Sequence, residues 1–132
     1  MLEKKDQLFE RNETNLNKYL VETIWFDDIL DYLPKNKENK NYEKAILKID
    51  IEGFEPFAFM HAKRLFDSID IPIIFMEWAN IPKQVDAYKE IMHLIDFLYS
   101  YNLRPHDEDG NELERKNWPT WSYDIIWKKD IN

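Results

Sequence analysis

The sequence of residues 45–55, AILKIDIEGFE, constrains the fold more than any other stretch of this chain. Its apolar residues follow one another with few interruptions, which is typical of a parallel strand buried on both faces. Asp50 and Glu52 come where this strand is expected to end, and Gly53 permits a sharp turn into a following helix. In open α/β sheets, ligands bind beyond the carboxyl ends of the strands. The stretch therefore predicts two carboxylates at the edge of the sheet where such folds carry out their chemistry.

Composition limits the classes of protein to which the chain can belong. A length of 132 residues with 44% hydrophobic side chains suits one domain with a substantial core. The absence of cysteine excludes disulfides, thiolate catalysis and cysteine zinc sites. A formal net charge of −8, with no dominant basic block, argues against nucleic acid as a partner. The sequence shows no signal peptide and no membrane segment, so the compartment is unknown and a cytoplasmic location is only the default expectation.

The first half of the chain predicts a polar segment followed by the start of the domain. Residues 1–20 are polar, with thinly scattered apolar side chains that suit one or two weakly amphipathic helices. The domain is expected to cover residues 21–132. It begins with a short strand at residues 21–26 (VETIWF), which are β-branched and aromatic, and a short helix at residues 28–33. A further helix is expected at residues 56–68, after the central strand at 45–51.

The second half predicts another strand, a long helix and a hairpin. Residues 71–78, IPIIFMEW, indicate a second strand buried on both faces. A helix is expected at residues 84–101, and a C-terminal hairpin at residues 103–129, because Asp109 and Gly110 form a strong turn signal. This order of elements predicts an α/β fold. The apolar stripe of the long helix is expected to consist of Tyr88, Ile91, Met92, Ile95, Leu98 and Tyr99.

Four segments occur in an order that resembles a known family. They are VETIWFDDIL at 21–30, LKIDIEGFEP at 47–56, IFMEW at 74–78 and DIIW at 124–127. Together they resemble the C-terminal half of the FkbM-type methyltransferases, over about residues 20–129. The resemblance implies part of a Rossmann-like class I methyltransferase sheet, with the two apolar strands as its fourth and fifth and the tail as its last two. It also implies transfer of a methyl group from S-adenosylmethionine, usually to a hydroxyl oxygen.

The chain departs from this family at the cofactor site. The family holds S-adenosylmethionine with a glycine-rich turn after its first strand, where the backbone must approach the cofactor closely. This chain has only two glycines, Gly53 and Gly110, so a Gly-x-Gly turn is impossible. Residues 1–20 do not resemble the part of the family that carries this turn. We therefore expect the chain to represent only the substrate-side half, which is inactive alone.

Asp50 and Glu52 are the leading candidates for catalytic residues. The resemblance implies that Asp50 lies beside cofactor and acceptor, where a carboxylate can accept a proton from a hydroxyl nucleophile. The structural alternative is that Asp50 caps the next helix and that Glu52 pairs with Lys48 or Arg64. Both interpretations stay open at the level of the sequence.

Two further pairs of residues are candidates for binding. Glu77 and Trp78 end the second apolar strand and are expected at the same edge, where they contact a substrate or bond to the loop at 79–83. Asp27 and Asp28 are weaker candidates for the cofactor's adenine side, and helix capping by Asp27 is the favoured alternative. These acids could suggest a hard-cation site. Their spacing specifies none, and no metal site is predicted.

The handedness of the connections predicts a sheet with one bare face. Right-handed crossovers between strands that progress in one direction place all connecting helices on the same face. The other face then needs a cover, since exposed apolar patches mark an interface or an instability. The candidates for the cover are residues 1–20, a missing N-terminal half, or another copy in a homo-oligomer.

Two functions from different classes remain open. The first is an O-methyltransferase of FkbM type acting on a small-molecule or glycan acceptor. The second is a non-catalytic remnant or interaction module that has lost the cofactor site.

Overall fold

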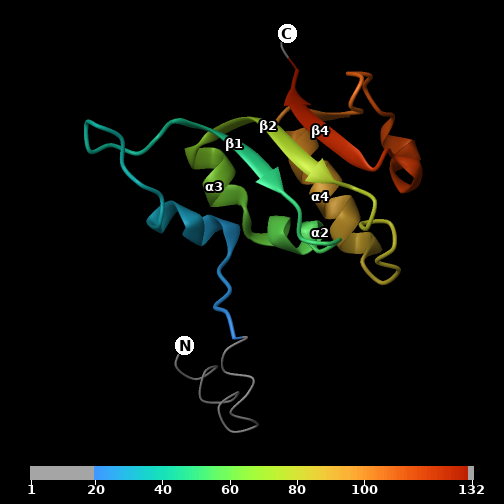
Figure 1. The fold of residues 1–132 in the computed structure, drawn as a ribbon, viewed down its shortest axis with the longest axis horizontal. Coiled ribbons are helices and arrows are strands. Elements are labelled where there is room, and N and C mark those ends of the chain that lie inside the picture. The colour runs from blue at the N-terminus through green and yellow to red at the C-terminus, as the bar shows by residue number, and fades with distance from the viewer. Residues whose placement is uncertain (1–19, 131–132) are drawn as a thin grey trace, which may run out of the picture.

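A computed structural model describes residues 20–130 and shows an α/β fold built on one open, mixed sheet (Figure 1). The order of the strands is β1-β2-β4-β3. β1 and β2 are parallel, whereas β4 is antiparallel to both of its neighbours. The predicted α/β class and the two apolar strands are confirmed. The strands are β1 (Lys44–Ile49), β2 (Asp70–Glu77), β3 (Leu103–His106) and β4 (Asp124–Lys129).

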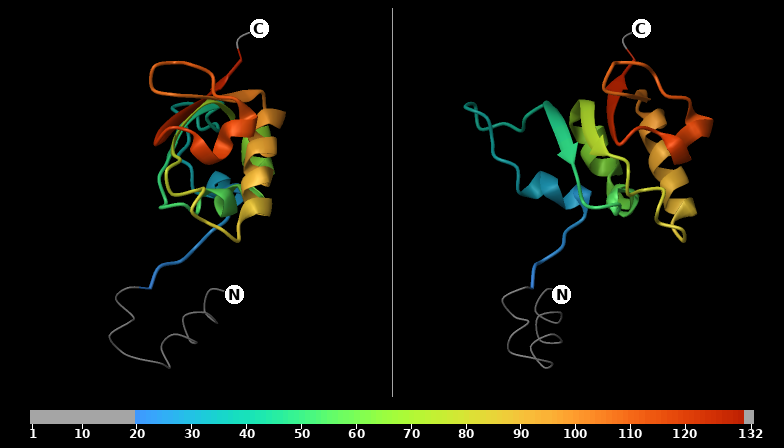
Figure 2. Two further views of the ribbon diagram at one scale, coloured as in Figure 1. Left: turned by 90° about the vertical axis from the view of Figure 1, so that its right-hand side faces the viewer. Right: turned by 45° about the vertical axis from the view of Figure 1, so that its right-hand side comes forward.

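The helices that connect the strands lie on one side of the sheet. α3 and α4 pack behind β1, β2 and β4 in Figure 1, and the edge-on view in Figure 2 places strands and helices in two separate layers. The expectation of a one-sided arrangement is therefore confirmed for residues 20–130. The helical elements are η2 (Phe26–Asp31), α2 (Glu55–Ala58), η3 (Phe59–His61), α3 (Lys63–Ser68), α4 (Tyr88–Ser100) and η4 (Arg115–Thr120).

The core fills the space between these two layers and is rich in aromatic side chains. Trp78 directly after β2, Trp127 on β4 and Phe59 on η3 are fully buried. Trp121 packs against both tryptophans, with ring centroids 4.7 Å and 5.7 Å away. The Trp78 indole N–H donates a 2.7 Å hydrogen bond to the carbonyl of Trp118. A core of this kind gives the small domain a large apolar area from few residues.

The prediction that both apolar strands are buried on both faces is wrong for residues 20–130. Ile46 on β1 is 66% exposed and Phe75 on β2 is 42% exposed, while Ile74 and Met76 on β2 are buried. The reason is geometric, because side chains of a strand alternate between the faces and the helices cover only one of them. An unbroken apolar run therefore does not by itself show that both faces are covered.

The strand predicted at residues 21–26 is also wrong. Residues 20–25 have no regular secondary structure, and the chain enters η2 at Phe26. The Trp25 ring packs against His61, with 3.9 Å between ring centroids, and not against a neighbouring strand. β propensity alone does not form a strand where no edge is available for pairing. The predicted helical segment lies outside the described residues, apart from Leu20.

The helix predicted at residues 56–68 is broken into three short pieces. The break before α3 lies at Ala62, whose φ of −126° is not helical. It allows Phe59 on η3, and Leu65 and Phe66 on α3, to be buried together. Packing of these side chains decides the course of the backbone here.

The long helix is confirmed, but it begins at Tyr88 and its buried stripe differs from the prediction. Tyr88 is 62% exposed, whereas Leu94 is fully buried beside Ile91 and Ile95.

The antiparallel pairing of β3 with β4 is confirmed, although η4 lies in the connection between them. None of the helices in residues 20–130 is long and apolar enough to cross a membrane.

Candidate functional site

Three carboxylates predicted from the sequence come together at the carboxyl ends of β1 and β2. Asp50 follows β1, Glu52 lies in the turn after it, and Glu77 is the last residue of β2. Each offers an oxygen, and these oxygens all lie within 4.8 Å of one another. The cluster forms because β1 and β2 are adjacent and parallel, so their carboxyl ends adjoin. We call Asp50, Glu52 and Glu77 the carboxylate cluster.

A tight turn after β1 positions Asp50 and Glu52. Glu52 and Gly53 both have positive φ, at 58° and 95°. The fully buried carboxylate of Glu55 holds the turn by accepting hydrogen bonds from the backbone N–H of Ile51 at 2.7 Å and of Gly53 at 2.9 Å. Glu55 was not predicted from the sequence. The only feature of the sequence that could have indicated this role is the position of Glu55, an acid two residues after a turn glycine.

The loop after β2 supplies the polar partner of the carboxylate cluster. The side-chain amide of Asn80 donates to Glu52 Oε2 at 3.2 Å and to Glu77 Oε1 at 3.1 Å. Lys83 donates to Asn80 Oδ1 at 3.3 Å. The amide thus ties the turn after β1 to the end of β2. Sequence reasoning named the loop at 79–83 as a partner of Glu77 but missed Asn80 as the link to Glu52.

The structural contacts considered for Asp50 and Glu52 are not observed among residues 20–130, where no ion pair joins Lys48 to Glu52. Helix α2 has Phe54 at its N-cap with no side-chain cap, so Asp50 does not cap it. Arg64, considered as a partner of Glu52, pairs with Asp31.

The environment of Glu77 raises the affinity of this carboxylate for a proton. Burial raises the pKa of Glu77 above that of an ordinary glutamate, and the charge of Asp50 and a hydrogen bond with it act in the same direction. The charge of Glu77 in turn raises the pKa of Tyr123, to which it is hydrogen-bonded.

A pocket of about 520 Å³ opens beside the carboxylate cluster, on the side of the sheet away from the helices. Asp50 and Glu77 lie on its wall next to Asp124 of β4. Glu108, in the turn after β3, adds a fourth acid. The pocket is therefore acidic at one end and apolar over the strands. Its lining consists of Lys48, Ile49, Asp50, Phe75, Met76, Glu77, Glu108, Asp124, Ile125 and Ile126.

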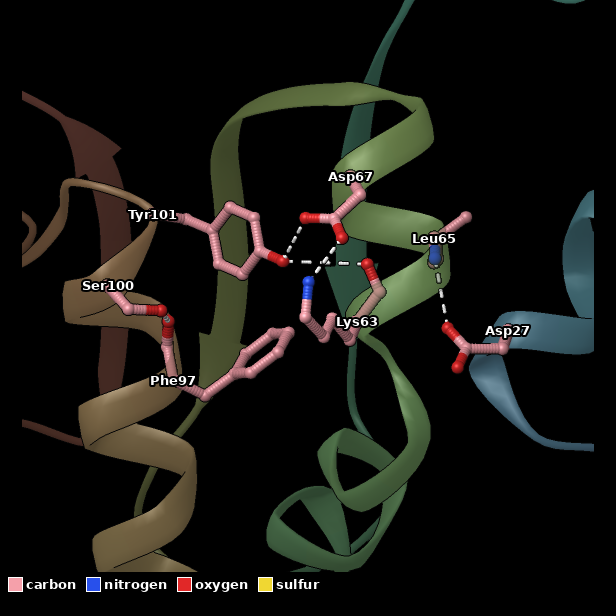
Figure 3. A network of polar contacts seen from close by, with 7 residues as sticks. All are labelled: Asp27, Lys63, Leu65, Asp67, Phe97, Ser100 and Tyr101. Carbon is pink, nitrogen blue, oxygen red and sulfur yellow. Dashed lines mark hydrogen bonds and ion pairs between the residues drawn. The ribbon is translucent and has the colours of Figure 1, made fainter.

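The remaining candidate residues lie elsewhere and do not line the pocket. Trp78 points into the core, where its side chain is fully buried. Asp27 Oδ1 accepts the backbone N–H of Leu65 at 2.9 Å, so it caps the start of α3 rather than its own helix (Figure 3). Asp28 Oδ2 accepts the backbone N–H of Trp25 at 3.2 Å.

The cluster suits two kinds of chemistry. A carboxyl group with a raised pKa, such as that of Glu77, can act as a general acid or base. Carboxylate oxygens that converge in this way are also the ligands that hard divalent cations take.

S-adenosylmethionine does not fit the residues of this chain by themselves. Gly53 is committed to the turn against Asn80, and Gly110 lies in the turn after β3, so neither provides a cofactor cradle.

Comparisons of the chain with protein-family models, with curated proteins and with solved structures find no match.

Proposed function

We propose that this chain is the substrate-side half of an S-adenosylmethionine-dependent O-methyltransferase of FkbM type. The observation that carries the proposal is the convergence of Asp50, Glu52 and Glu77 beside an open pocket. The sequence resemblance supports it, because it places an acceptor site at the end of the strand that Asp50 follows. The parallel pair of β1 and β2, followed by two further strands on the side of β2, agrees with the implied half-sheet.

The roles of the residues follow from their positions in the pocket. Asp50 is exposed on the pocket wall, where a carboxylate can accept the proton of a hydroxyl group as its oxygen becomes nucleophilic. Glu77 would bind a neighbouring hydroxyl. The exposed ring of Phe75 offers an apolar surface to the carbon skeleton of the acceptor. Such a pocket suits a polyhydroxylated acceptor such as a glycan. S-adenosylmethionine would supply the methyl group, and no step of its binding is assigned to this chain.

The acceptor role is tested by titrating simple methyl glycosides into the isotope-labelled chain and following its backbone amide signals. Shifts are expected at residues 48–53, 75–80 and 123–126. Asp50→Asn should reduce the affinity at least about fivefold, because the pocket loses the acceptor of the hydroxyl proton. Asp86→Asn is the matched control, since Asp86 is an exposed acid that does not line the pocket. An absence of shifts, or shifts that Asp50→Asn leaves unchanged, would overturn the assignment.

The cofactor half of the proposal is tested by calorimetric titration of S-adenosylmethionine into the purified, folded chain. No binding is expected, since the chain has no glycine-rich turn to hold the cofactor. Micromolar affinity would show that the chain rebuilds a cofactor site without glycines. It would then be wrong to call it only a substrate-side half.

A non-catalytic interaction module is the second candidate function. The exposed Ile46 and Phe75 favour it, since an uncovered apolar sheet face suits a partner surface. The glycoside titration distinguishes the two candidates, because a pure interaction module has no reason to bind acceptor hydroxyls at Asp50.

A further inference from the structure

The side of the sheet away from the helices carries an ordered pattern of charge and apolar surface. Its side chains form three rows across β1, β2 and β4, which we together call the open face. The amino row, toward the amino ends of β1 and β2, consists of Ile46, Ile73 and Lys128. The middle row consists of Lys48, Phe75 and Ile126. The acidic row, at the carboxyl ends of β1 and β2, consists of Asp50, Glu77 and Asp124.

None of residues 20–130 covers the open face. Ile46 is 66% exposed and Phe75 is 42% exposed, while Ile73 and Ile126 are half-buried between their neighbours. The helices in both views of Figure 2 lie on the other side of the sheet. An exposed apolar surface with a polar rim marks a site of interaction.

The charge of the open face changes sign along the strands. Lys48 and Lys128 have no ion pair among residues 20–130, and Lys44, one step before the amino row, pairs with Asp70. The opposite end carries the three acids of the acidic row, with Glu108 beside them. The face is therefore basic toward one end, apolar in its centre and acidic at the other end.

β3 extends the amino and middle rows at one edge of the open face. Arg104 pairs with Lys128, and His106 pairs with Ile126. The Arg104 guanidinium lies over the ring of Tyr99 on α4, 4.4 Å from its centroid. Its charge is thus held at the edge of the face and adds to the basic end.

A surface of this kind is complementary to itself when two copies meet in opposite directions. If the strands of the two faces ran the same way, the two acidic rows would lie against each other. When the strands run in opposite directions, the acidic row of each copy lies over the amino row of the other. A two-fold axis between the faces, running across the strands, gives this arrangement.

We propose that two copies of this chain associate through their open faces, about a two-fold axis over the middle rows. Phe75 and Ile126 then lie against the same residues of the other copy and form an apolar centre. Aromatic rings and aliphatic side chains at the centre of an interface supply most of its binding energy. Stacked sheets of this kind pack about 10 Å apart with interdigitating side chains.

The charged residues of the open face find partners in this dimer. Asp124 is two residues before Ile126 and Lys128 is two residues after it, so each Asp124 lies opposite Lys128 of the other copy. Lys48 in the middle row is one row, about 7 Å along the strand, from Asp50 of the other copy, within reach of its side chain. Because both pairs occur twice, the dimer contains four ion pairs between copies.

Glu77 is the acid of the open face that gains no lysine in this arrangement. It lies opposite Ile73 of the other copy, since both are two residues from Phe75. Its hydrogen bond from the Asn80 amide, at 3.1 Å, is within one chain and stays in place in the dimer.

The dimensions of the open face predict a weak dimer. Four strands about 4.8 Å apart, each with seven residues of about 3.3 Å, give a face of about 19 Å by 23 Å. This area is at the lower end of the range for specific interfaces. The net charge of −8 on each copy also opposes their approach. We therefore expect a dissociation constant in the micromolar range.

The association is tested by sedimentation equilibrium of the purified chain at about 5 to 500 µM, which brackets the affinity of a weak dimer. The native chain should change from monomer to dimer over this range. Phe75→Asp should raise the dissociation constant at least about thirtyfold, because it places two carboxylates in the apolar centre. Val85→Asp is the matched control, since Val85 is 85% exposed and lies outside the open face. A native chain that stays monomeric would overturn the proposal and leave the face to another segment of the chain or to a different protein.

A charge exchange tests the direction of the two copies. Lys128→Glu alone should weaken the dimer about tenfold or more, because it twice places an acid opposite Asp124. Asp124→Lys alone should weaken it similarly, by placing lysine opposite Lys128. The double variant exchanges the two charges and should dimerise within a few-fold of the native chain. Failure of the double variant to recover, or single variants that dimerise like the native chain, would contradict the antiparallel arrangement.

The dimer also covers the acidic pocket, because the middle and acidic rows belong to its lining. The dimer does not depend on the proposed function, but competition between dimer and acceptor rests on it. A methyl glycoside that binds at the pocket should shift the native chain toward monomer. If no glycoside binds while the variants behave as expected, the proposed function fails and the dimer stands. A glycoside that binds the pocket without dissociating the dimer would show that the copies meet elsewhere.

Discussion

At residue 53 the backbone has a φ of 95°, and an added Cβ would lie 2.8 Å from the carbonyl oxygen of Asn80. Gly110 offers a matched control, since it has a φ of 89° but no atom within 4 Å of the same position. We expect Gly110→Ala to cost about 1 kcal/mol in the free energy of unfolding, for the left-handed conformation alone. Gly53→Ala should cost about 1–3 kcal/mol more, because it also forces the turn and the Asn80 loop apart.

Urea denaturation of the two glycine variants measures this difference directly. It also reports on the site, because separation of the turn from Asn80 should alter the Glu77 pKa. Equal losses of stability in the two variants would mean that the close approach of Gly53 to Asn80 is not a constraint.

The raised pKa of Glu77 leads to a stability that depends on pH. The folded state binds this proton more tightly than the unfolded state does, so stability falls as the pH rises from the ordinary glutamate value through the raised one. Glu77→Gln stays neutral and can still accept the hydrogen bond from Asn80. We therefore expect the variant to gain stability over the native chain between pH 4 and pH 7, and to gain none at pH 3.

Unfolding free energies across this pH range provide the measurement. A carboxyl-carbon titration by NMR supplies an independent one, in which Asp50→Asn should lower the pKa of Glu77 by removing the charge and the hydrogen bond of Asp50. A pKa of Glu77 that does not change in Asp50→Asn would show that the two groups do not interact.

At the scale of elements, a polar network joins the end of α4 to α3 (Figure 3). The Tyr101 hydroxyl donates to Asp67 Oδ1 at 2.5 Å, and Lys63 pairs with the same carboxylate at 2.5 Å. Burial, and then the hydrogen bond to Asp67, raise the pKa of Tyr101 to about 12. These contacts link the C-terminal end of α4 to α3.

Tyr101 should therefore be among the last tyrosines to ionise. In a spectrophotometric titration, Tyr101→Phe should remove the ionisation near pH 12, and Asp67→Asn should lower it while burial keeps it above 10. Because the folded state favours the protonated phenol, stability should decline as the pH rises from 10 to 12. At pH 7 the loss of the hydrogen bond in Tyr101→Phe should cost about 1 kcal/mol. An unchanged titration curve in Tyr101→Phe would contradict this assignment.

At the scale of the whole molecule, the sheet formed by residues 20–130 has two inner and two outer strands. β2 and β4 are paired on both sides, while β1 and β3 each have one neighbour among the described residues. Native-state hydrogen exchange should therefore show the slowest amides in β2 and β4, and faster exchange along β1. Protection of β1 equal to that of β2 would show that a further strand pairs with its outer edge, which is incompatible with the order seen here.

The carboxylate cluster was predictable because it depends on local order and one rule of sheet geometry. Asp50 and Glu77 each follow an apolar run, and parallel neighbours end at the same edge. Asn80, Glu55 and Tyr123 were missed because their roles depend on where loops from different parts of the chain meet. The sequence predicted that Trp78 contacts a substrate at the same edge as Glu77. Adjacent residues of an extended chain point in opposite directions, so Trp78 points into the core instead.

The sequence by itself determined which segments form β1, β2, β4 and α4, and where the chain turns at Gly53. These features depend on local apolar pattern and on the conformational freedom of glycine. Only the tertiary structure decided which face of each strand is buried, how residues 56–68 break into three pieces, and that residues 21–26 do not form a strand. Burial and strand pairing belong to contacts between distant segments, so no local pattern encodes them.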